Sequence, residues 1–332
     1  MKNDHFCCPC CGALDSQVLY RKRDHPLILQ GLSECTNIVK CEICGAAYTD
    51  PMPTQTQLDC IYNDEFIYPA EFTESEIKGH LSYIKQLEKL LSQGSGKLLD
   101  IGCASGLLLS LAVANGWQAF GLDISEKLLD VARRQVPQAT LFLGPIEMAS
   151  YESDCFDAVI ALNLLEHLSN PVKLLKEVNR VLRPGGLFLF KTVRIDSIPA
   201  RRRKMNWDHL KWPGHLLWYS EKSFALMLQN ANFRVKKSQV TGVPYIPGVK
   251  RYMDHRIYTN NQYANTGATM QSKQFKTSMP LIKRILKIML KNGLVKSCAS
   301  YLNTTFQLGD TVTIFAEKEA ANNRIDRTLN FP

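Results

Sequence analysis

The chain has 332 residues, of which 45% are hydrophobic and 21% charged, and its formal net charge is +9. This length and apolar content exclude a disordered chain and accommodate one large domain with a small additional module. The first residues lack the long apolar stretch of a secretory signal. No later run reaches the roughly twenty apolar residues of a membrane span, so we expect a cytoplasmic protein.

Most of the 11 cysteines precede Ala46, and in a reducing compartment such a cluster favours metal ligation over disulfides. Two C-x-x-C-G knuckles run from Cys8 to Gly12 and from Cys41 to Gly45. Each knuckle brings two thiolates to one ion, and four sulfurs complete a tetrahedral shell with no position left for water. The sequence therefore predicts a structural zinc ion bound by Cys8, Cys11, Cys41 and Cys44.

The register of the first knuckle stays open, because Cys7 and Cys10 have the same spacing and Cys35 is a substitute ligand. Isolated cysteines are more often small buried or surface side chains than ligands. We interpret three further cysteines in this way: Cys60, Cys155 and Cys298.

Residues 1–54, which contain the two knuckles, are predicted to form a small zinc-binding unit, called the ribbon below. Residues 55–96 are predicted to link the ribbon to the next domain. Apolar residues recur with helical period from Glu74 to Gln93, and Gly94-Ser-Gly96 ends the pattern. We expect one amphipathic helix in this linker.

A Gly-rich turn follows the apolar run Lys97 to Ile101, which the pattern predicts to be a buried strand. The turn has the spacing D-x-G-x-x-x-G, and the helical pattern of Leu107 to Ala114 comes after it. A second strand, Gln118 to Asp123, ends in an acid where such folds bind ribose hydroxyls. The dinucleotide fingerprint is not met, because Ala104 and Leu107 stand where it needs glycines, so NAD is disfavoured.

Further segments follow in order: a strand and loop from Phe156 to Leu168, a helix from Leu174 to Leu182, the stop Arg183-Pro-Gly-Gly186, and a strand from Leu187 to Thr192. With the acid and glycine spacing, this series resembles the class I S-adenosylmethionine-dependent methyltransferases. The resemblance implies S-adenosylmethionine as the cofactor and a doubly wound, Rossmann-like sheet of seven strands. The two knuckles ahead of this series resemble the zinc ribbons that precede many bacterial methyltransferases of sugar, polysaccharide and secondary-metabolite pathways.

The methyltransferase domain is predicted to span residues 97–332. A helix from Glu221 to Asn230 and a strand from Phe233 to Thr241 precede the last strand, Asp310 to Glu317, which the resemblance makes the antiparallel strand that completes the sheet. Residues 242–309 are then an insertion. Its basic amphipathic stretch, Leu281 to Leu290, is interpreted as a lid or packing helix, with peripheral membrane contact as the alternative.

The resemblance also assigns cofactor contacts by position. Gly102 and Gly106 let the backbone approach the cofactor, Asp100 holds its amino acid end, and Asp123 binds the ribose hydroxyls. The remaining contacts are predicted beside the adenine, at Ile124 and Ile146, and beside the methionine moiety, at Asn163 and Leu164.

The acceptor side is predicted from histidines and aromatic residues. His167 has a near-neutral reference pKa and is a candidate proton acceptor. The segment Trp207 to Ser220 resembles the substrate-side loop of the family, and within it His215 and Tyr219 are candidates to bind or deprotonate the acceptor. The competing interpretation of His167 is that it orients its loop or caps the helix there, and that of His215 and Tyr219 is hydrogen-bonded packing.

A small-molecule, sugar or glycan acceptor is the expected substrate. RNA is the alternative, because Arg201-Arg-Arg-Lys204 and the net charge suit phosphate. A non-catalytic zinc-ribbon interaction protein is the alternative outside enzymes, but its Gly-rich motif or ribose acid would usually be eroded, and both are intact. Neither the acceptor atom nor the oligomeric state is predicted by the sequence.

Overall fold

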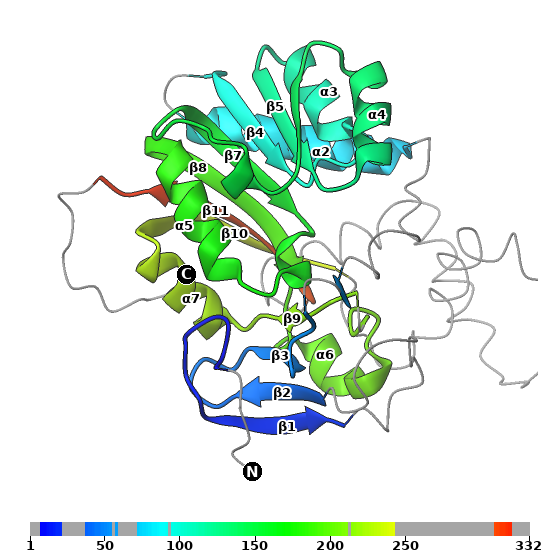
Figure 1. The fold of residues 1–332 in the computed structure, drawn as a ribbon, viewed down its shortest axis with the longest axis vertical. Helices are drawn as coiled ribbons and strands as arrows, with labels where there is room; N and C mark the ends of the chain where they lie inside the picture. The colour runs from blue at the N-terminus through cyan, green and yellow to red at the C-terminus, as the bar shows by residue number, and fades with distance from the viewer. Residues whose placement is uncertain are drawn as a thin grey trace, which may run out of the picture.

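A computed structural model describes residues 7–21, 37–54, 57–58, 72–91, 94–211, 214–242 and 309–320. Several features discussed above lie outside the described residues: Cys35, Cys60, Cys298 and the helix expected from Leu281 to Leu290. Two sheets organise the rest of the chain, and Figure 1 shows the smaller one beside α6 (Ile198–Arg203).

The large sheet has seven strands in the order β10-β11-β8-β7-β4-β5-β6. The five strands from β8 to β6 run parallel, and β11 pairs antiparallel with both β8 and β10. The prediction of a doubly wound, Rossmann-like sheet of seven strands is confirmed. The strands are β4 (Lys97–Ile101), β5 (Gln118–Asp123), β6 (Thr140–Leu143), β7 (Phe156–Leu162), β8 (Leu182–Val193), β10 (Phe233–Thr241) and β11 (Thr311–Lys318).

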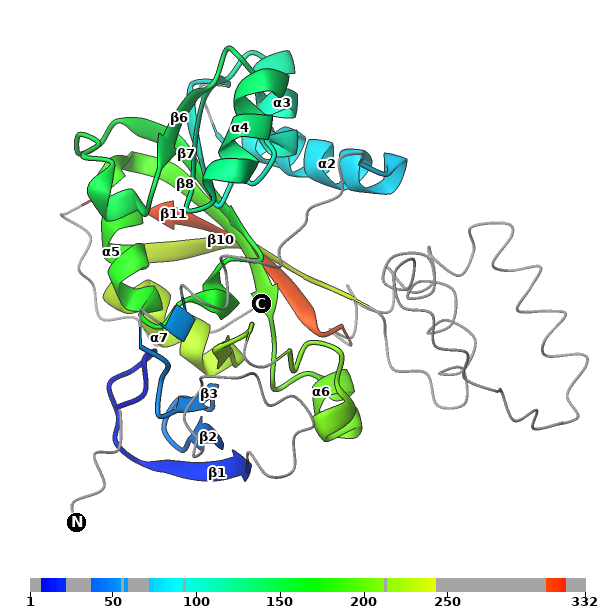
Figure 2. The ribbon, with the colours of Figure 1, turned by 45° about the vertical axis from the view of Figure 1, so that its right-hand side comes forward.

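Helices cover both faces of this sheet, because its central strands are apolar on both sides. In β8, Phe188 and Phe190 belong to the core on one face, whereas Leu187 and Leu189 belong to the core on the other. The first core includes apolar residues of α5 (Pro171–Val181) and α7 (Glu221–Asn230). The second includes residues of α2 (Glu74–Leu90), α3 (Leu107–Ala114) and α4 (Glu126–Gln135), which Figure 2 shows grouped at the end of the molecule away from β1.

Local capping signals explain where the helices begin. Thr73 and Glu76 form a reciprocal capping box at the start of α2. Asn170 caps α5 through a hydrogen bond from the Lys173 N–H (3.1 Å), and Pro171 occupies the first turn, so this helix begins three residues before the predicted Leu174. The helices α4 and α6 and strand β6 are additional to the predicted elements.

The small sheet combines three N-terminal strands with one from a distant segment of the chain, in the order β1-β2-β3-β9. Three strands lie in the predicted ribbon: β1 (Ser16–Tyr20), β2 (Asn37–Cys41) and β3 (Ala47–Asp50). The fourth strand, β9 (Leu217–Trp218), comes from the substrate-side segment of the larger domain and pairs antiparallel with β3. A shared apolar core packs Ile38 and Ala47 of the ribbon with Ala200, Trp207 and Trp218. The ribbon therefore shares both a sheet and a core with the domain that follows it.

Among the helices of the described residues, none combines the length and the apolar character needed to cross a bilayer.

Candidate active site

The Gly-rich turn lies at the carboxyl end of β4, where a parallel sheet of this type binds ligands. Gly106, the N-cap of α3, has a φ of +90°, and a Cβ placed on it would lie 3.2 Å from the Cβ of Ala132 in α4. A glycine at this position is required both by the backbone conformation and by the close approach of α4. The turn is held to the next strand by hydrogen bonds from the N–H groups of Gly102 (2.8 Å) and Cys103 (3.0 Å) to the Leu122 carbonyl.

Asp123 joins the turn to the end of β5. Its Oδ2 accepts a hydrogen bond from the Ala104 N–H (2.9 Å), and its Oδ1 accepts one from the Ser125 N–H (2.9 Å). A carboxylate offers about four lone-pair sites, so these two bonds leave acceptor capacity for ribose hydroxyls. The side chain predicted to bind the ribose thus also fixes the conformation of the Gly-rich turn.

Asp100 is buried, with 4% of its surface exposed, and its carboxyl group interacts electrostatically with that of Asp123. Burial, with a smaller contribution from the negative charge of Asp123, raises the pKa of Asp100 to about 8. Burial also raises the pKa of Asp123. Two buried acids at the ends of the adjacent strands β4 and β5 form an environment in which a bound cationic group is electrostatically favourable.

Exposed apolar side chains lie at the ends of β5 and β6. Ile124 is 64% exposed. Leu143, which pairs with Asp123 between β5 and β6, is 43% exposed. Met148, in the 3₁₀ helix η2 (Ile146–Met148), is 68% exposed, whereas Ile146 is 1% exposed and belongs to the core. The position of Met148 makes it a candidate adenine contact that sequence reasoning missed, because the 3₁₀ turn decides which of these residues points inward.

Asn163 and Leu164 follow β7 at the same edge of the sheet. Asn163 has a left-handed backbone, with φ at +51°, and its N–H donates to the Lys191 carbonyl (2.8 Å). The Leu164 Cδ1 lies 3.5 Å from the point where a Cβ on Gly102 would stand, so Leu164 packs directly over the Gly-rich turn.

The groups at this edge fit the cofactor that the resemblance implies. They comprise two acids for a cationic amino group and a ribose, apolar side chains for an adenine, and a turn in which glycine allows close approach. The hydroxyl of Ser105 in the same turn is buried and has no hydrogen-bond partner within the described residues. Such a group is unfavourable unless a ligand or water satisfies it.

A second polar cluster lies beside the loop that follows β7. Candidate ligand atoms of Glu166, His167 and His215 lie within 4.8 Å of one another, and the two imidazole rings meet edge to face with centroids 4.9 Å apart. Glu166 is 2% exposed, and its Oε2 accepts a hydrogen bond from the Thr192 hydroxyl (2.7 Å). The Glu166 carbonyl accepts a hydrogen bond from the Leu216 N–H (2.8 Å). Glu166 was not among the predicted site residues.

Burial sets the protonation of these groups. It raises the pKa of Glu166 to about 7, lowers the pKa of His167, and lowers the pKa of His215 to about 2. The nearby His167 and Lys211 lower the pKa of His215 further. Both imidazoles are therefore neutral at physiological pH.

Tyr219 is fully buried, and burial raises its pKa well above the usual value. Its hydroxyl donates a hydrogen bond to the Leu165 carbonyl (2.7 Å), and its ring stacks on Phe224 with centroids 5.0 Å apart. Trp207 and Trp218 are also buried, 3% and 0% exposed. These three aromatic residues form the interior support of the substrate-side segment.

The ribbon cysteines converge as a group of four. The sulfurs of Cys8, Cys11, Cys41 and Cys44 lie within 4.8 Å of one another. The Cys8 and Cys44 sulfurs are 3.5 Å apart, and those of Cys11 and Cys41 are 3.6 Å apart. A tetrahedron with Zn–S bonds of about 2.3 Å has edges of about 3.8 Å, so this donor set fits zinc. Cys7 is exposed, and Cys10 is buried beside Cys8 and Cys44.

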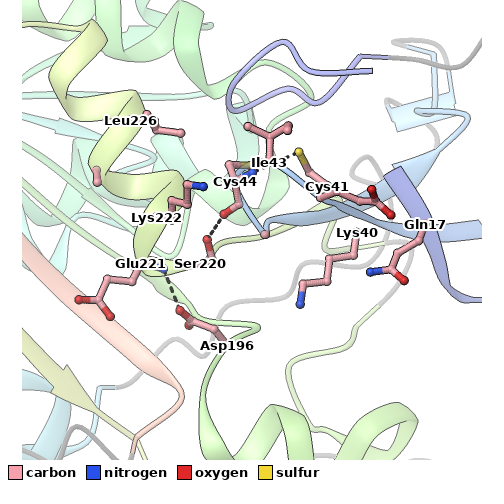
Figure 3. Close-up of a pocket in the computed structure, with 13 residues that line it drawn as sticks. Gln17, Lys40, Cys41, Ile43, Cys44, Asp196, Ser220, Glu221, Lys222 and Leu226 are labelled. Carbon is pink, nitrogen blue, oxygen red and sulfur yellow. Dashed lines mark hydrogen bonds between the residues drawn. The ribbon is translucent and has the colours of Figure 1, made fainter. Parts of the chain in front are cut away.

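A groove of about 920 Å³ lies where the ribbon meets the start of α7, away from the Gly-rich turn. Figure 3 shows the side chains of Lys40, Asp196, Glu221 and Lys222 around it. The Ser220 hydroxyl donates to the Cys44 carbonyl at its floor, and the Glu221 N–H donates to Asp196 Oδ2 (2.9 Å). The lining thus combines charged side chains of both signs with apolar ones, among them Ile43 and Leu226.

Comparison with known proteins places this site in a recognised class of domain. A family model described as a methyltransferase domain matches residues 76–238. The chain is 31% identical over 114 residues to a ubiquinone biosynthesis O-methyltransferase of Coxiella burnetii, covering 33% of this chain and 49% of that protein. It is 34% identical over 104 residues to the protein of the same name from Idiomarina loihiensis, covering 29% and 42%. The chain thus spans about half or less of the length of these curated relatives.

The chain is also similar, at low identity, to solved structures of methyltransferases. An S-adenosylmethionine-dependent methyltransferase from Mesorhizobium loti is 17% identical, with a TM-score of 0.46, and the match covers 73% of this chain and 99% of that one. One from Archaeoglobus fulgidus is 16% identical, with a TM-score of 0.46, and covers 73% and 94%.

Proposed function

We propose that residues 76–238, which match a family model described as a methyltransferase domain, bind S-adenosylmethionine and transfer its methyl group to a hydroxyl of a small-molecule acceptor. The observation that carries the proposal is the bond from the Ala104 N–H to Asp123, which joins the Gly-rich turn to the ribose-binding acid at adjacent strand ends. The relatives named for O-methylation support oxygen as the acceptor atom.

In this proposal the cofactor supplies an electrophilic methyl group, and the side chains bind, orient and exclude water. Asp100 binds the amino group of the cofactor and Asp123 its ribose. Ile124 and Met148 flank the adenine, and Asn163 and Leu164 lie beside the methionine moiety. His167 and His215 lie on the acceptor side, whereas Tyr219 supports their segment from the interior.

The zinc ribbon is proposed to be structural. Its four cysteines complete a tetrahedral shell, and a metal so enclosed has no position for a substrate. Its function is then to fix β2, β3 and, through the β3–β9 pairing, the segment that carries His215.

The acceptor is proposed to be a sugar or glycan unit. The supporting observation is the groove next to β9, in which Lys40, Lys222, Glu42 and Glu221 occur beside the apolar Ile43 and Leu226. Such donors and acceptors suit the hydroxyl or phosphate groups of a glycan. A lipid-soluble quinone-type phenol is the acceptor class to compare directly.

RNA is a weaker proposal. Arg203 of the basic run forms an ion pair with Asp208, so part of the positive charge is neutralised within the protein. Methylation of RNA predicts activity that falls steeply with salt, whereas transfer to a small acceptor does not.

The test is calorimetric titration of the zinc-loaded protein with S-adenosylmethionine and with its demethylated product. We expect micromolar binding that Asp123→Ala abolishes. Asp130→Ala is the matched control, because Asp130 is an exposed acid of α4 paired with Arg133. Absence of binding by the unaltered protein would refute the cofactor assignment and favour the non-catalytic alternative. If the cofactor binds, transfer assays would compare nucleotide-linked sugars with catechol-type phenols and RNA as acceptors.

A further inference from the structure

The cluster of Glu166, His167 and His215 has a composition that cofactor binding does not explain. Two imidazoles and one carboxylate converge from segments about fifty residues apart, with candidate ligand atoms within 4.8 Å of one another. This donor set is the one that proteins use for Mn²⁺, Fe²⁺, Co²⁺ or Zn²⁺ when the metal keeps open coordination positions.

Hydrogen bonds orient each member of the cluster. The Nδ1 of His167 lies 2.7 Å from the Gly214 carbonyl, and the Nδ1 of His215 lies 2.9 Å from the His209 carbonyl. A carbonyl only accepts hydrogen bonds, so both Nδ1 atoms carry the proton and the lone pair of each neutral ring is on Nε2. Metal-binding histidines have this arrangement, in which the distal N–H donates to a carbonyl and fixes the ring.

The carboxylate is held in a comparable way. The Thr192 hydroxyl donates to Glu166 Oε2, and the Leu216 N–H fixes the backbone of Glu166 against the segment that carries His215. Both Glu166 and Thr192 are buried, 2% and 0% exposed. A buried carboxylate is unfavourable without a compensating charge, and a divalent cation supplies one.

We propose that Glu166, His167 and His215 bind a divalent metal ion that holds an oxygen of the methyl acceptor. This role rests on the proposed function. The cluster begins two residues after Leu164, so it lies next to the predicted methionine site. A metal in such a position lowers the pKa of a hydroxyl bound to it. In the transfer, the hydroxyl proton passes to the solvent, and an oxygen electron pair forms the new C–O bond. The C–S bond breaks with its electron pair remaining on sulfur.

The test uses full-length protein whose ribbon is loaded with zinc, titrated with Mn²⁺ by electron paramagnetic resonance and with Co²⁺ by absorption. We expect one equivalent of each ion in addition to the ribbon zinc, without the thiolate charge-transfer bands that a cysteine site would give. His215→Gln is expected to weaken binding more than about tenfold, because even changes in the surrounding hydrogen bonds cost about 10- to 100-fold. Thr192→Val removes the hydrogen bond to Glu166 and is expected to weaken metal binding by about 10- to 100-fold.

His80→Gln is the control, since His80 belongs to α2 and its Nδ1 lies near the Glu76 carbonyl. If the buried variants fail to fold, the unaltered protein still decides the question. Mn²⁺ should broaden the imidazole resonances of His167 and His215 at lower concentration than those of His80. Absence of a second bound ion, or broadening that spares these two rings, overturns the proposal.

Titration with S-adenosylmethionine in parallel separates the two proposals. Cofactor binding without a second metal refutes the metal site alone. Metal binding without cofactor binding leaves the metal site in place and refutes its role in methyl transfer, together with the proposed function.

Discussion

Leu217 pairs with Tyr48, so the segment that carries His215 is also the edge strand of the cysteine-bearing sheet. The contact is reinforced by the Thr49 N–H, which donates to the Leu216 carbonyl (3.1 Å), and by the Ser220 hydroxyl, which donates to the Cys44 carbonyl. Because the ribbon is too small to have an independent core, a change in its metal content should reach the acceptor side of the site.

Removal of zinc should therefore weaken the acceptor side more than the cofactor site. Cys44→Ser is expected to lose the bound zinc and to lower the melting temperature by roughly 10 °C, as the loss of several kcal/mol would do in a domain of this size. Metal analysis and thermal unfolding measure both effects. Cys7→Ser is the control, because Cys7 is exposed and lies outside the group of four sulfurs. Equal zinc content in the two variants would contradict the assignment of ligands.

The buried acid Asp100 should make cofactor binding dependent on pH. Its pKa is raised to about 8, so at pH 6 it is protonated and cannot attract a cationic amino group. The affinity for S-adenosylmethionine should increase from pH 6 to pH 8 as the carboxylate ionises, by up to about tenfold per pH unit. Calorimetry across this range measures the slope, and Asp100→Asn should have weak binding with this slope removed. An unchanged slope in the variant would assign the dependence to another group.

The same shift has the opposite effect on the stability of the protein without cofactor. A pKa raised above the unfolded value means that the native state binds the extra proton between about pH 4 and 8. The contribution of Asp100 to stability is therefore fully present below about pH 4 and is lost as the pH rises through about 8. Denaturant unfolding of the unaltered protein and of Asp100→Asn should converge at low pH and diverge toward pH 8.

Gly106→Ala should lose both stability and cofactor affinity. The φ of +90° costs an alanine about 1 to 2 kcal/mol, and its Cβ would lie 3.2 Å from Ala132. Gly185→Ala is the matched control, because Gly185 has a φ of +77° but open space around it. We expect comparable backbone strain in both variants. Binding of S-adenosylmethionine should be lost in Gly106→Ala alone. Loss of binding in Gly185→Ala would show that global destabilisation explains the effect.

Tyr219→Phe distinguishes a supporting tyrosine from a catalytic one. The variant removes the hydrogen bond to the Leu165 carbonyl and leaves that buried carbonyl without this donor, which should cost about 1 to 3 kcal/mol of unfolding free energy. We expect kcat to change less than about threefold when measured well below the melting temperature of the variant. Tyr151→Phe is the control, since the Tyr151 hydroxyl is buried without a partner among the described residues, and its removal should be neutral or stabilising. A loss of kcat of about a hundredfold in Tyr219→Phe would instead indicate proton transfer by this hydroxyl.

The parallel strands β4, β5, β7 and β8 and the start of α3 were predictable because their signals are local, whereas the parallel strand β6 was not predicted. Buried strands appear as apolar runs, and Gly102 and Gly106 mark the turn in which the chain changes from strand to helix. The start of α5 was missed by three residues because the apolar pattern begins at Leu174, whereas the cap, Asn170, is polar. The burial of Ile146, a predicted adenine contact, could not be read from the sequence for a related reason, since a single 3₁₀ turn has too few residues to show a period.

The sequence by itself determined the spacing within each knuckle, the Gly-rich turn and the acid at the end of the second strand, because residues within about four positions are held together by the chain. Tertiary structure alone decided that β9 completes the ribbon sheet and that His215 lies beside Glu166 and His167. These contacts join segments about fifty to one hundred and seventy residues apart. Their formation depends on the register in which β3 meets β9 and on the shared core of Ile38, Ala200 and Trp218, which bury apolar surface only once the two parts of the chain have packed together.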